Sequence, residues 1–412
     1  MPISCKKGIR AAFFPSLFFL IIGGMNAEEV HSSDPGPIIS VLARHGFENV
    51  AVIEDTAEVI ITYENRIYRF EVRAVQEVLN LLPGLPAPGK KLILIPQKRG
   101  IPIVAVVFGN YSGVWPLIIG TACGECRFVV DAALDVESYW RKLKQVPKSN
   151  PSFMKFDGFV HPQFRVQFGN VLDAMESQVN LAPALSMSAW SGMQVSGQWI
   201  FPIQNELGTE GDHGRPGLLT LNQTMRLPCH SFVSGTLGYF TQHRYGADLE
   251  VKKFWSNGRM AVAAEAGYTG YAEYHKNGWY YSDPDRWTWH LSAETRFAAV
   301  DLTVKLTCGR FIYRDTGFRL DAARQFGETA IGFFGLRTDR GRNGGFSISV
   351  PLFPSKRQQP KRVRVSPAPY FPWSYRFKGL PLQGLQYSTA NSIDEFLFNL
   401  NPDFIRNQLI RN

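Results

Sequence analysis

Charged residues are scarce in this chain, and long apolar runs are scarcer. Asp, Glu, Lys and Arg make up 19% of the 412 residues, whereas aromatic residues reach 13% and glycine occurs 37 times. Beyond the N-terminal region, no segment approaches the ~20 apolar residues that a membrane-spanning helix needs. Few charges with abundant glycine and aromatics are instead typical of many short strands whose outer face is not in water.

Cysteine is also rare, with five in the chain, and none directly follows the N-terminal apolar run, which argues against a lipoprotein anchor. Cys123 and Cys126 form the one close pair and could be a redox pair, a metal pair or a local disulfide. With no second pair and no nearby His, we expect no metal site. A disulfide formed in an oxidising compartment is the preferred reading, ahead of a redox role.

A secretory signal peptide is predicted for residues 1–27. Three basic residues (Lys6, Lys7 and Arg10) precede an apolar run over 11–22, and small residues then lead to Ala27. The alternative is an N-terminal membrane anchor, for which the run is short. Removing these basic residues lowers the net charge from +9 to +6, a modest excess that indicates no nucleic-acid partner.

Residues 28–110 are predicted to form a small periplasmic α/β domain. The pattern indicates a hairpin of 58–63 and 66–73 around Glu64-Asn65, because these residues suit a tight turn. The other predicted elements are helices at 38–45 and 74–82 and strands at 49–54, 91–96 and 103–108. No catalytic constellation is visible in this domain. Residues 111–157 are expected to be a connecting segment that carries the cysteine pair.

Alternation of apolar and polar side chains dominates residues 158–353. For example, Trp287, Trp289, Leu291 and Ala293 alternate with Thr288, His290, Ser292 and Glu294. A period of two over ~8–11 residues means a strand with one apolar and one polar face. Twelve such segments begin near residues 159, 177, 193, 218, 232, 246, 259, 287, 301, 317, 329 and 345.

A soluble sandwich and a membrane barrel both satisfy this alternation, but segment and loop lengths favour the barrel. The segments are close to the ~9–11 residues that a tilted strand needs to cross a bilayer. Tight connections at 257–258 and 297–301 contrast with long polar loops at 205–217 and 271–286. The sequence therefore predicts a mainly β fold, a transmembrane antiparallel β-barrel of about 12 strands, with its long loops opposite the periplasmic domain.

The polar face of these strands supplies candidate lumen-lining residues, namely Asp248, Glu250, Lys252, His290, Glu294, Arg296, Asp301 and Lys305. Mixed charges suit a hydrated channel, and they equally suit a narrow or plugged barrel in which they pair across the interior. His290 and Ser292 on one strand face are not a recognised catalytic arrangement, so we expect no enzyme and no cofactor. Cys229 and Cys308 are expected to face lipid without being bridged to each other.

Residues 354–412 are predicted to be a basic, Pro-rich periplasmic tail, because the best closing strand is the internal segment 344–353. The tail is either a solvated linker or a docking site for partners. Its candidate docking residues are Lys356, Arg357, Lys361, Arg362 and Arg364.

Several motifs resemble the YjbH/GfcD-type outer-membrane proteins associated with exopolysaccharide production. They are Gly46–Val50, Tyr63–Arg69, Leu94–Pro96 with Arg99–Ile103, Gly238–Phe240 with Arg244–Gly246, Arg324–Thr329 and Gly344–Pro351. The resemblance covers roughly residues 40–355. It implies an outer-membrane location, a role in polysaccharide secretion or assembly, and partners that include outer-membrane lipid, polysaccharide and other envelope proteins of the same system. The role could be that of a conduit or of a non-conducting scaffold.

Overall fold

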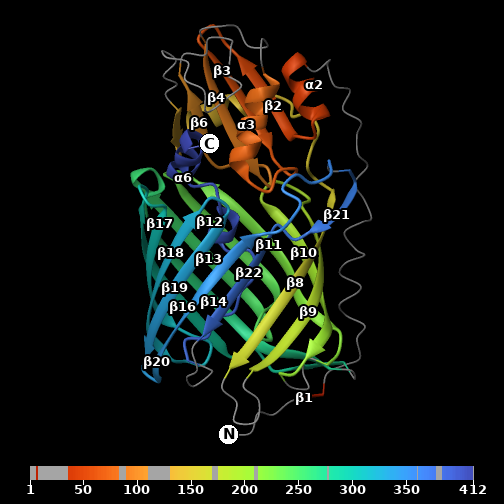
Figure 1. Cartoon of the computed structure of the whole chain (residues 1–412), viewed down its shortest axis with the longest axis vertical. Coiled ribbons are helices and arrows are strands. Elements are labelled where there is room, and N and C mark those ends of the chain that lie inside the picture. Colours follow the sequence, from red (N-terminus) through yellow and green to blue (C-terminus); the bar gives the residue numbers. More distant parts are fainter. Residues whose placement is uncertain are drawn as a thin grey trace.

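The chain forms a small α/β module at one end of a large curled sheet (Figure 1). This computed structural model describes residues 6–7, 36–82, 90–109, 130–168, 175–207, 212–275, 278–359, 361–376 and 383–411. The predicted signal peptide lies outside these residues, apart from β1 (Lys6–Lys7), which pairs with β15 of the large sheet. Cys123 and Cys126 also lie outside them. No helix in the described residues is long and apolar enough to cross a membrane.

The module is a mixed sheet in the order β2-β3-β4-β6-β7, with β5 beside β4 and only β3 and β4 running parallel. Its elements are α2 (Pro37–Arg44), β2 (Glu48–Glu54), β3 (Glu58–Glu64), α3 (Glu71–Leu81), β4 (Lys91–Lys98), β5 (Ile101–Pro102), β6 (Ala105–Phe108), β7 (Val130–Ala133) and α4 (Glu137–Leu143). Both faces of the sheet are covered. Val59 and Ile61 of β3 pack with α2 and α3 on one face. On the other face, Ile60 packs with Val136 and with Leu143 of α4.

The hairpin predicted around Glu64-Asn65 is wrong. The Asn65 side chain accepts hydrogen bonds from the backbone amides of Ile67 and Tyr68 at 3.1 and 2.8 Å. This local turn satisfies the amides that a returning strand would have used, so the chain leads into α3 at Glu71. β3 instead takes β4 as its second neighbour.

Glu71 begins α3 with a buried carboxyl group. Asn65 Nδ2 donates to one carboxylate oxygen at 3.0 Å, while burial outweighs this bond and raises the pKa of Glu71 to about 7. The folded chain therefore holds this proton to a higher pH than the unfolded chain, whose Glu pKa is about 4.5. The resulting stabilisation is complete below that value and is lost as the pH rises through 7.

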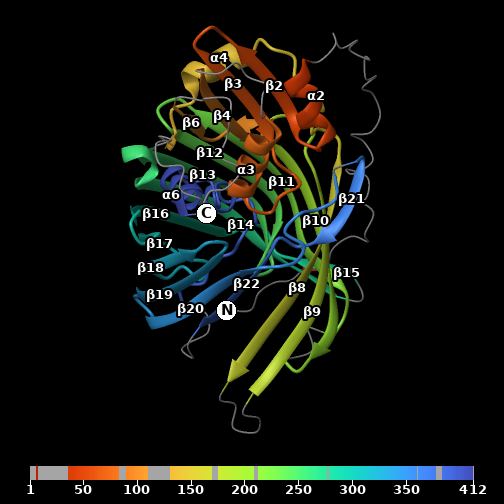
Figure 2. The same cartoon turned by 45° about the horizontal axis from the view of Figure 1, so that its top comes forward.

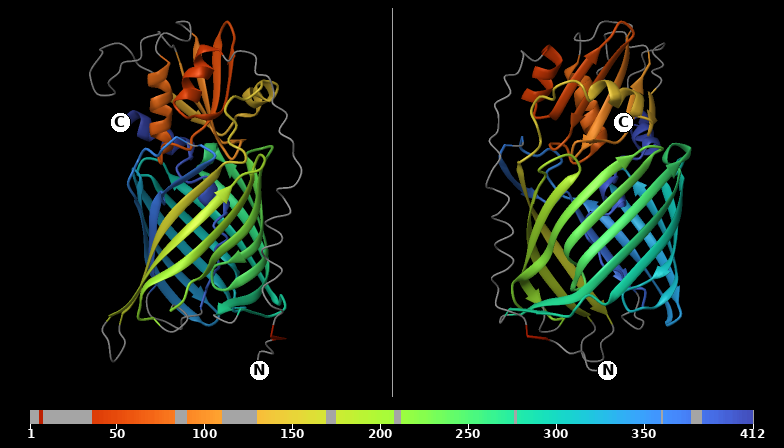
Figure 3. Two further views of the ribbon diagram at one scale, coloured as in Figure 1. Left: turned by 90° about the vertical axis from the view of Figure 1, so that its right-hand side faces the viewer. Right: turned by 180° about the vertical axis from the view of Figure 1, so that it is seen from behind.

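The large sheet contains all twelve strands that the alternation predicts. They are β8 (Phe156–Phe168), β9 (Met175–Met187), β10 (Met193–Asn205), β11 (Arg215–Leu227), β12 (Ser231–Phe240), β13 (Arg244–Trp255), β14 (Met260–His275), β16 (Arg286–Phe297), β17 (Leu302–Arg310), β18 (Thr316–Phe326), β19 (Thr329–Thr338) and β20 (Gly341–Pro351). Each pairs antiparallel with the next, β15 (Gly278–Tyr281) adds to the end of β14, and η2 (Ser256–Gly258) makes one turn. The wall that they form is barrel-shaped (Figure 3). We call the space that it surrounds the lumen.

The sheet does not end near residue 353, which corrects the predicted boundary and the even strand number. The segment 363–376 joins both edges of the sheet. Its first half, β21 (Val363–Pro367), runs parallel to β8, and its second half, β22 (Tyr370–Arg376), runs antiparallel to β20. Counted with this segment, the wall has thirteen strand positions among the described residues, so its first and last positions run parallel. In the same residues no strand pairing joins β8 directly to β22.

The C-terminal helix α6 (Pro402–Arg411) completes the core of the N-terminal module. Phe404, Ile405 and Leu409 belong to the same buried cluster as the apolar residues of α2 and α3. The rings of Phe404 and Phe70 meet edge to face, with their centroids 5.8 Å apart. Figure 1 shows α6 at the junction between the module and the rim of the large sheet. The N-terminal module and the C-terminal helix are thus parts of one hydrophobic core.

We expect Phe404→Ala to release α6 from the module, because truncating a buried Phe costs about 3–5 kcal/mol. Hydrogen exchange of the α6 amides should accelerate strongly in this variant. Ile410→Ala on the same helix is the matched control, since Ile410 is 64% exposed. Equal protection of α6 in the two variants would contradict its assignment to the module core.

We also expect the module to be less stable at pH 8 than at pH 5, by up to about 3 kcal/mol from Glu71 alone. Protection of the α3 amides against hydrogen exchange measures this difference. Glu71→Gln should abolish most of the pH dependence, and Glu77→Gln on the same helix should retain it. A wild-type module with the same α3 protection at both pH values would show that Glu71 is not held protonated.

Candidate functional site

The lumen is occupied by the chain's own C-terminal segment, residues 383–401, which we call the plug. It contains α5 (Ile393–Phe396), whose N-terminus is closed by a capping box of Ser392 and Glu395. Tyr387 Oη donates to Asp248 Oδ2 at 2.7 Å, and the Ile393 amide donates to Glu250 Oε2 at 2.7 Å. The plug is therefore bonded to the acidic side chains of β13.

Asp394 lies at the centre of the plug's ion pairs. Its two carboxylate oxygens meet Lys252 Nζ at 2.5 Å and Lys305 Nζ at 2.7 Å. Lys252 also contacts Glu294 at 2.7 Å, and its side chain is only 2% exposed. A buried ammonium group needs such partners, because an unpaired charge out of water is strongly destabilising. The plug thus supplies a carboxylate that the wall requires.

A cavity of about 550 Å³ remains between the plug and the wall. Seven of the eight predicted lumen residues line it, namely Asp248, Glu250, Lys252, His290, Glu294, Arg296 and Lys305. Asp301 does not line it and lies in the turn before β17, where it forms an ion pair with Arg296 at 3.0 Å. The sequence reasoning missed Glu265, Arg319, Asp321 and Asp394, which also line this cavity. The first three lie on the polar face of their strands, so the alternation could have predicted them. Asp394 lies outside the strands, where no such period exists.

Some of the lumen groups pair with neighbours on the wall itself. His290 Nδ1 lies 3.3 Å from Glu265 Oε2, and its ring packs against Phe311. Arg319 contacts Asp321 at 2.7 Å and stacks over the Phe334 ring. The part of the chain that the structure describes contains no cluster of His, Cys, Asp and Glu suited to hold a metal ion.

The module also contacts the plug directly. Lys98 Nζ donates to the carbonyl oxygen of Phe396 at 2.7 Å, and Arg99 Nη2 donates to Asn391 Oδ1 at 3.3 Å. Burial lowers the pKa of Lys98 to about 8 and that of Arg99 to about 10. Arg99 also donates to Asn222 of β11 at 2.9 Å, so one module residue joins the wall and the plug.

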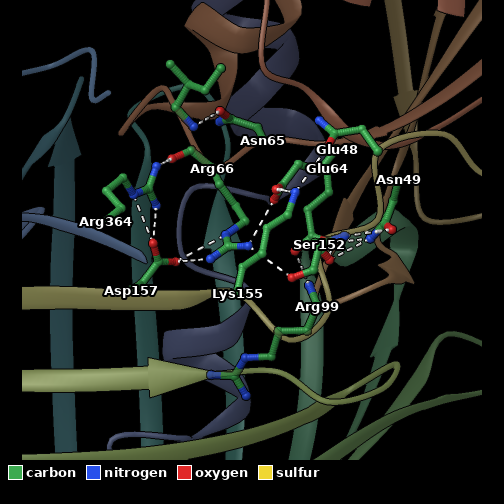
Figure 4. Close-up of polar contacts among 12 residues, drawn as sticks. Glu48, Asn49, Glu64, Asn65, Arg66, Arg99, Ser152, Lys155, Asp157 and Arg364 are labelled. Carbon is green, nitrogen blue, oxygen red and sulfur yellow. Dashed lines mark hydrogen bonds and ion pairs between the residues drawn. The ribbon is translucent and has the colours of Figure 1, made fainter. Parts of the chain in front are cut away.

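A second polar cluster fixes the module to the start of the large sheet (Figure 4). Arg66 contacts Glu48 at 3.0 Å and Asp157 of β8 at 2.5 Å. Arg364 of β21 contacts the other oxygen of Asp157 at 2.7 Å, and Lys155 contacts Glu48. Burial raises the pKa of Glu48, although Arg66 and Lys155 oppose this effect. We call Arg66, Asp157 and Arg364 the junction cluster.

The predicted docking residues of the tail have separate roles within the chain. Arg364 belongs to the junction cluster. Lys356 Nζ lies 5.3 Å from the Tyr68 ring centre, and the Arg357 guanidinium lies 5.2 Å from that of Phe159. Lys361 is exposed, and the Arg362 carbonyl accepts a hydrogen bond from the Phe156 amide at 2.8 Å. They therefore do not form one patch.

Cys229 and Cys308 are both free. Cys308 lies in β17 opposite Leu291, in phase with the apolar face as expected. Cys229 is not on a strand, because β11 ends at Leu227 and Cys229 occupies the following turn with φ +58°.

A similar protein is found among the solved structures. The structure is a loop L8 deletion mutant of OmpT, an outer membrane protein of Vibrio cholerae. The likeness covers 47% of this chain and 85% of that one, with 8% sequence identity and a TM-score of 0.25. No family model matches the chain, and no curated protein does.

We expect Asp394→Asn to loosen the plug, because Lys252 and Lys305 would lose their shared carboxylate. Lys252 is buried, but the Asp394 side chain is 44% exposed, so solvent screening keeps the cost well below the ~3–5 kcal/mol of a fully buried pair. Faster hydrogen exchange over 386–400 would report this change. Asp283→Asn, in the connection between β15 and β16, is the control and should leave the plug unaffected. Unchanged plug protection in Asp394→Asn would show that these ion pairs do not hold it.

Proposed function

We propose that this chain is an outer-membrane β-barrel with a periplasmic module, and that it takes part in exopolysaccharide secretion or assembly as a conduit closed by its own plug. The observation that carries the proposal is the division of the large sheet into an apolar outside and a charged, plug-filled inside. The twelve strands that the alternation predicted are 9–16 residues long, enough to cross a bilayer when tilted.

Two aromatic girdles on the outer face support the membrane location. At the module end, the exposed aromatic residues Trp255, Phe297 and Phe326 each terminate a strand. At the far end, Trp287 and Phe318 are 59% and 61% exposed. Exposed aliphatic residues fill the band between them, namely Leu249, Val251, Val262, Leu291, Leu306 and Leu320. Aromatic rings at both rims of an apolar band are the arrangement of outer-membrane barrels.

The loops agree with this orientation. β13 and β14 are joined at the module end by η2, and its Asn257 donates to the Ala132 carbonyl of the module at 2.7 Å. The longer connections, 206–214 and 276–285, lie at the opposite end of the strands. Short periplasmic turns and long outer loops are usual in such barrels, which supports a periplasmic module.

The polysaccharide role is supported by the resemblance to YjbH/GfcD-type proteins and by the polar lumen. The cavity beside the plug is lined by both acids and bases, as a path for a hydrated polar molecule would be. A second candidate function is a non-conducting scaffold. It is favoured by the bonds that tie the plug to both the wall and the module, such as Asp394 to Lys252 and Lys98 to Phe396.

Membrane-extracted protein should migrate faster on a gel before boiling than after it, because a folded barrel resists detergent. In planar bilayers, the full chain should be electrically silent, whereas the double variant Tyr387→Ala/Asp394→Ala should show discrete conductance steps. The physical reason is that both side chains bond the plug to the wall, at 2.5–2.7 Å.

Ser388→Ala is the matched control on the plug, because Ser388 is exposed. A full chain that conducts freely would contradict closure by the plug. Silence of the double variant, with the barrel still folded on the gel, would favour the scaffold. Loss of exported polysaccharide after removal of the chain from its host tests the cellular role.

A further inference from the structure

The joint between β8 and β22 is the one place in the wall where neighbouring described strands are not hydrogen-bonded along their length. β21 pairs with β8 only over Phe156–Val160. The last backbone bond on this joint runs from the Ala368 amide to the Val160 carbonyl, at 3.0 Å. Beyond it, the only pairing of His161–Phe168 among the described residues is with β9. We call the facing stretches 161–168 and 370–376 the open seam.

The sequence of the open seam opposes backbone pairing. Pro162 of β8 and Pro372 of β22 have no amide hydrogen to donate. Proline within a sheet is normally confined to edge positions, because it removes a ladder bond. Figure 2 shows β8 and β9 diverging from β20 and β22 towards the far end of the sheet. Both stretches of the open seam thus have the proline content that is typical of edge strands.

Aromatic side chains bridge the open seam in place of hydrogen bonds. The rings of Phe164 and Trp373 stack with centroids 6.4 Å apart, and those of Phe168 and Tyr375 meet at 5.6 Å. Phe164 and Phe168 are 39% and 45% exposed on the outer face. Side chains can separate and close again without breaking a strand ladder. Unpaired backbone facing hydrocarbon is strongly unfavourable, so this seam requires something to cover it.

The inner side of the seam is polar. On β8, His161, Gln163 and Arg165 share the face of Asp157, opposite to Phe164. On β22, Arg376 donates to the carbonyls of Gln383 and Gly384, at the start of the plug. A molecule lying across the seam would therefore meet polar groups towards the lumen and aromatic rings towards the lipid.

The junction cluster closes the module end of the same joint. Asp157 stands where β8 begins and binds Arg364 of β21 and Arg66 of the module. Arg364 also donates to the Arg66 carbonyl. The module therefore clamps one end of the joint and leaves the other end to side-chain contacts.

We propose that the open seam is a lateral opening between the lumen and the bilayer, and that it admits a membrane amphiphile with a polar head and an apolar chain. The head enters the lumen beside the plug while the chain stays among Phe164, Phe168, Trp373 and Tyr375. This inference rests on the proposed membrane location, and it adds a binding site to it.

Photocrosslinking in phosphatidylcholine vesicles that contain phosphatidylglycerol tests the seam. p-Benzoylphenylalanine replacing Gln163, on the lumen side of the seam, should crosslink to phospholipid. The same group replacing Ser292, which lines the cavity on the far wall, should not. Replacing Leu291 on the outer face gives the positive control, since it is 51% exposed. Equal labelling at positions 163 and 292 would overturn the proposal.

A disulfide that joins β8 to β22 across the open seam provides the second test. It is introduced into a chain whose native cysteines are replaced by Ser. Oxidised Phe164→Cys/Trp373→Cys should lower crosslinking from position 163 at least fivefold relative to its reduced form. Ser347→Cys/Ser374→Cys spans register partners in the paired strands β20 and β22 and should have no effect. If the first cysteine variant does not fold into a heat-modifiable barrel, Phe168→Cys/Tyr375→Cys replaces it as the tether across the open seam. Crosslinking that the tether leaves unchanged, in a folded and electrically silent barrel, would overturn this inference while leaving the proposed function intact.

Discussion

Burial of α6 in the core of the module is the constraint on which the rest of this structure depends. The chain leaves the sheet at β22, crosses the lumen as the plug and ends in a helix that lies inside the core of its own N-terminal module. Each fully buried side chain of the size of Phe404 or Ile405 contributes about 1.5–3 kcal/mol. The plug cannot leave the lumen at its module end unless this burial is given up, so it is held at both ends.

The electrostatics of the lumen follow from that arrangement. A wide water-filled channel can leave its charges solvated, whereas a filled lumen must pair them. Asp394 is the clearest case, because Lys252 of β13 and Lys305 of β17 both contact this one carboxylate of the plug. The wall and the plug are therefore complementary, and neither has a satisfied interior by itself. Displacing the plug would require water or a polar ligand to replace its groups.

The sequence predicted the wall far better than the plug, and the reason is physical. A strand with one apolar face and one face towards a polar interior must alternate, so all twelve segments were visible, with starts within four residues of those observed. The lumen residues on those strands followed from the same alternation. β21 and β22 are short, contain prolines and lie in a basic stretch, so no period marks them. The plug binds through single side chains such as Tyr387 and Asp394, whose partners are more than 85 residues away.

The hairpin error at Asn65 has a related cause. Glu64-Asn65 suits a two-residue turn, but the Asn65 side chain satisfies the following amides itself, and the apolar residues after it belong to a helix. Short-range signals could not distinguish the two outcomes. The parallel neighbour of β3 is β4, which begins at Lys91, 27 residues after β3 ends at Glu64. Only the tertiary pairing decides between them.

With thirteen strand positions, the joint between the first and the last position is parallel. Hydrogen bonds join β21 to β8 over five residues only, which is a weak attachment for a wall of this size. The junction cluster adds Arg66 from the module and Arg364 from β21 to a single carboxylate, Asp157. Charge-assisted bonds of this kind are roughly twice as strong as neutral ones. The module therefore adds ion pairs at a joint where backbone pairing is short, and the same module packs against α6, which follows the plug.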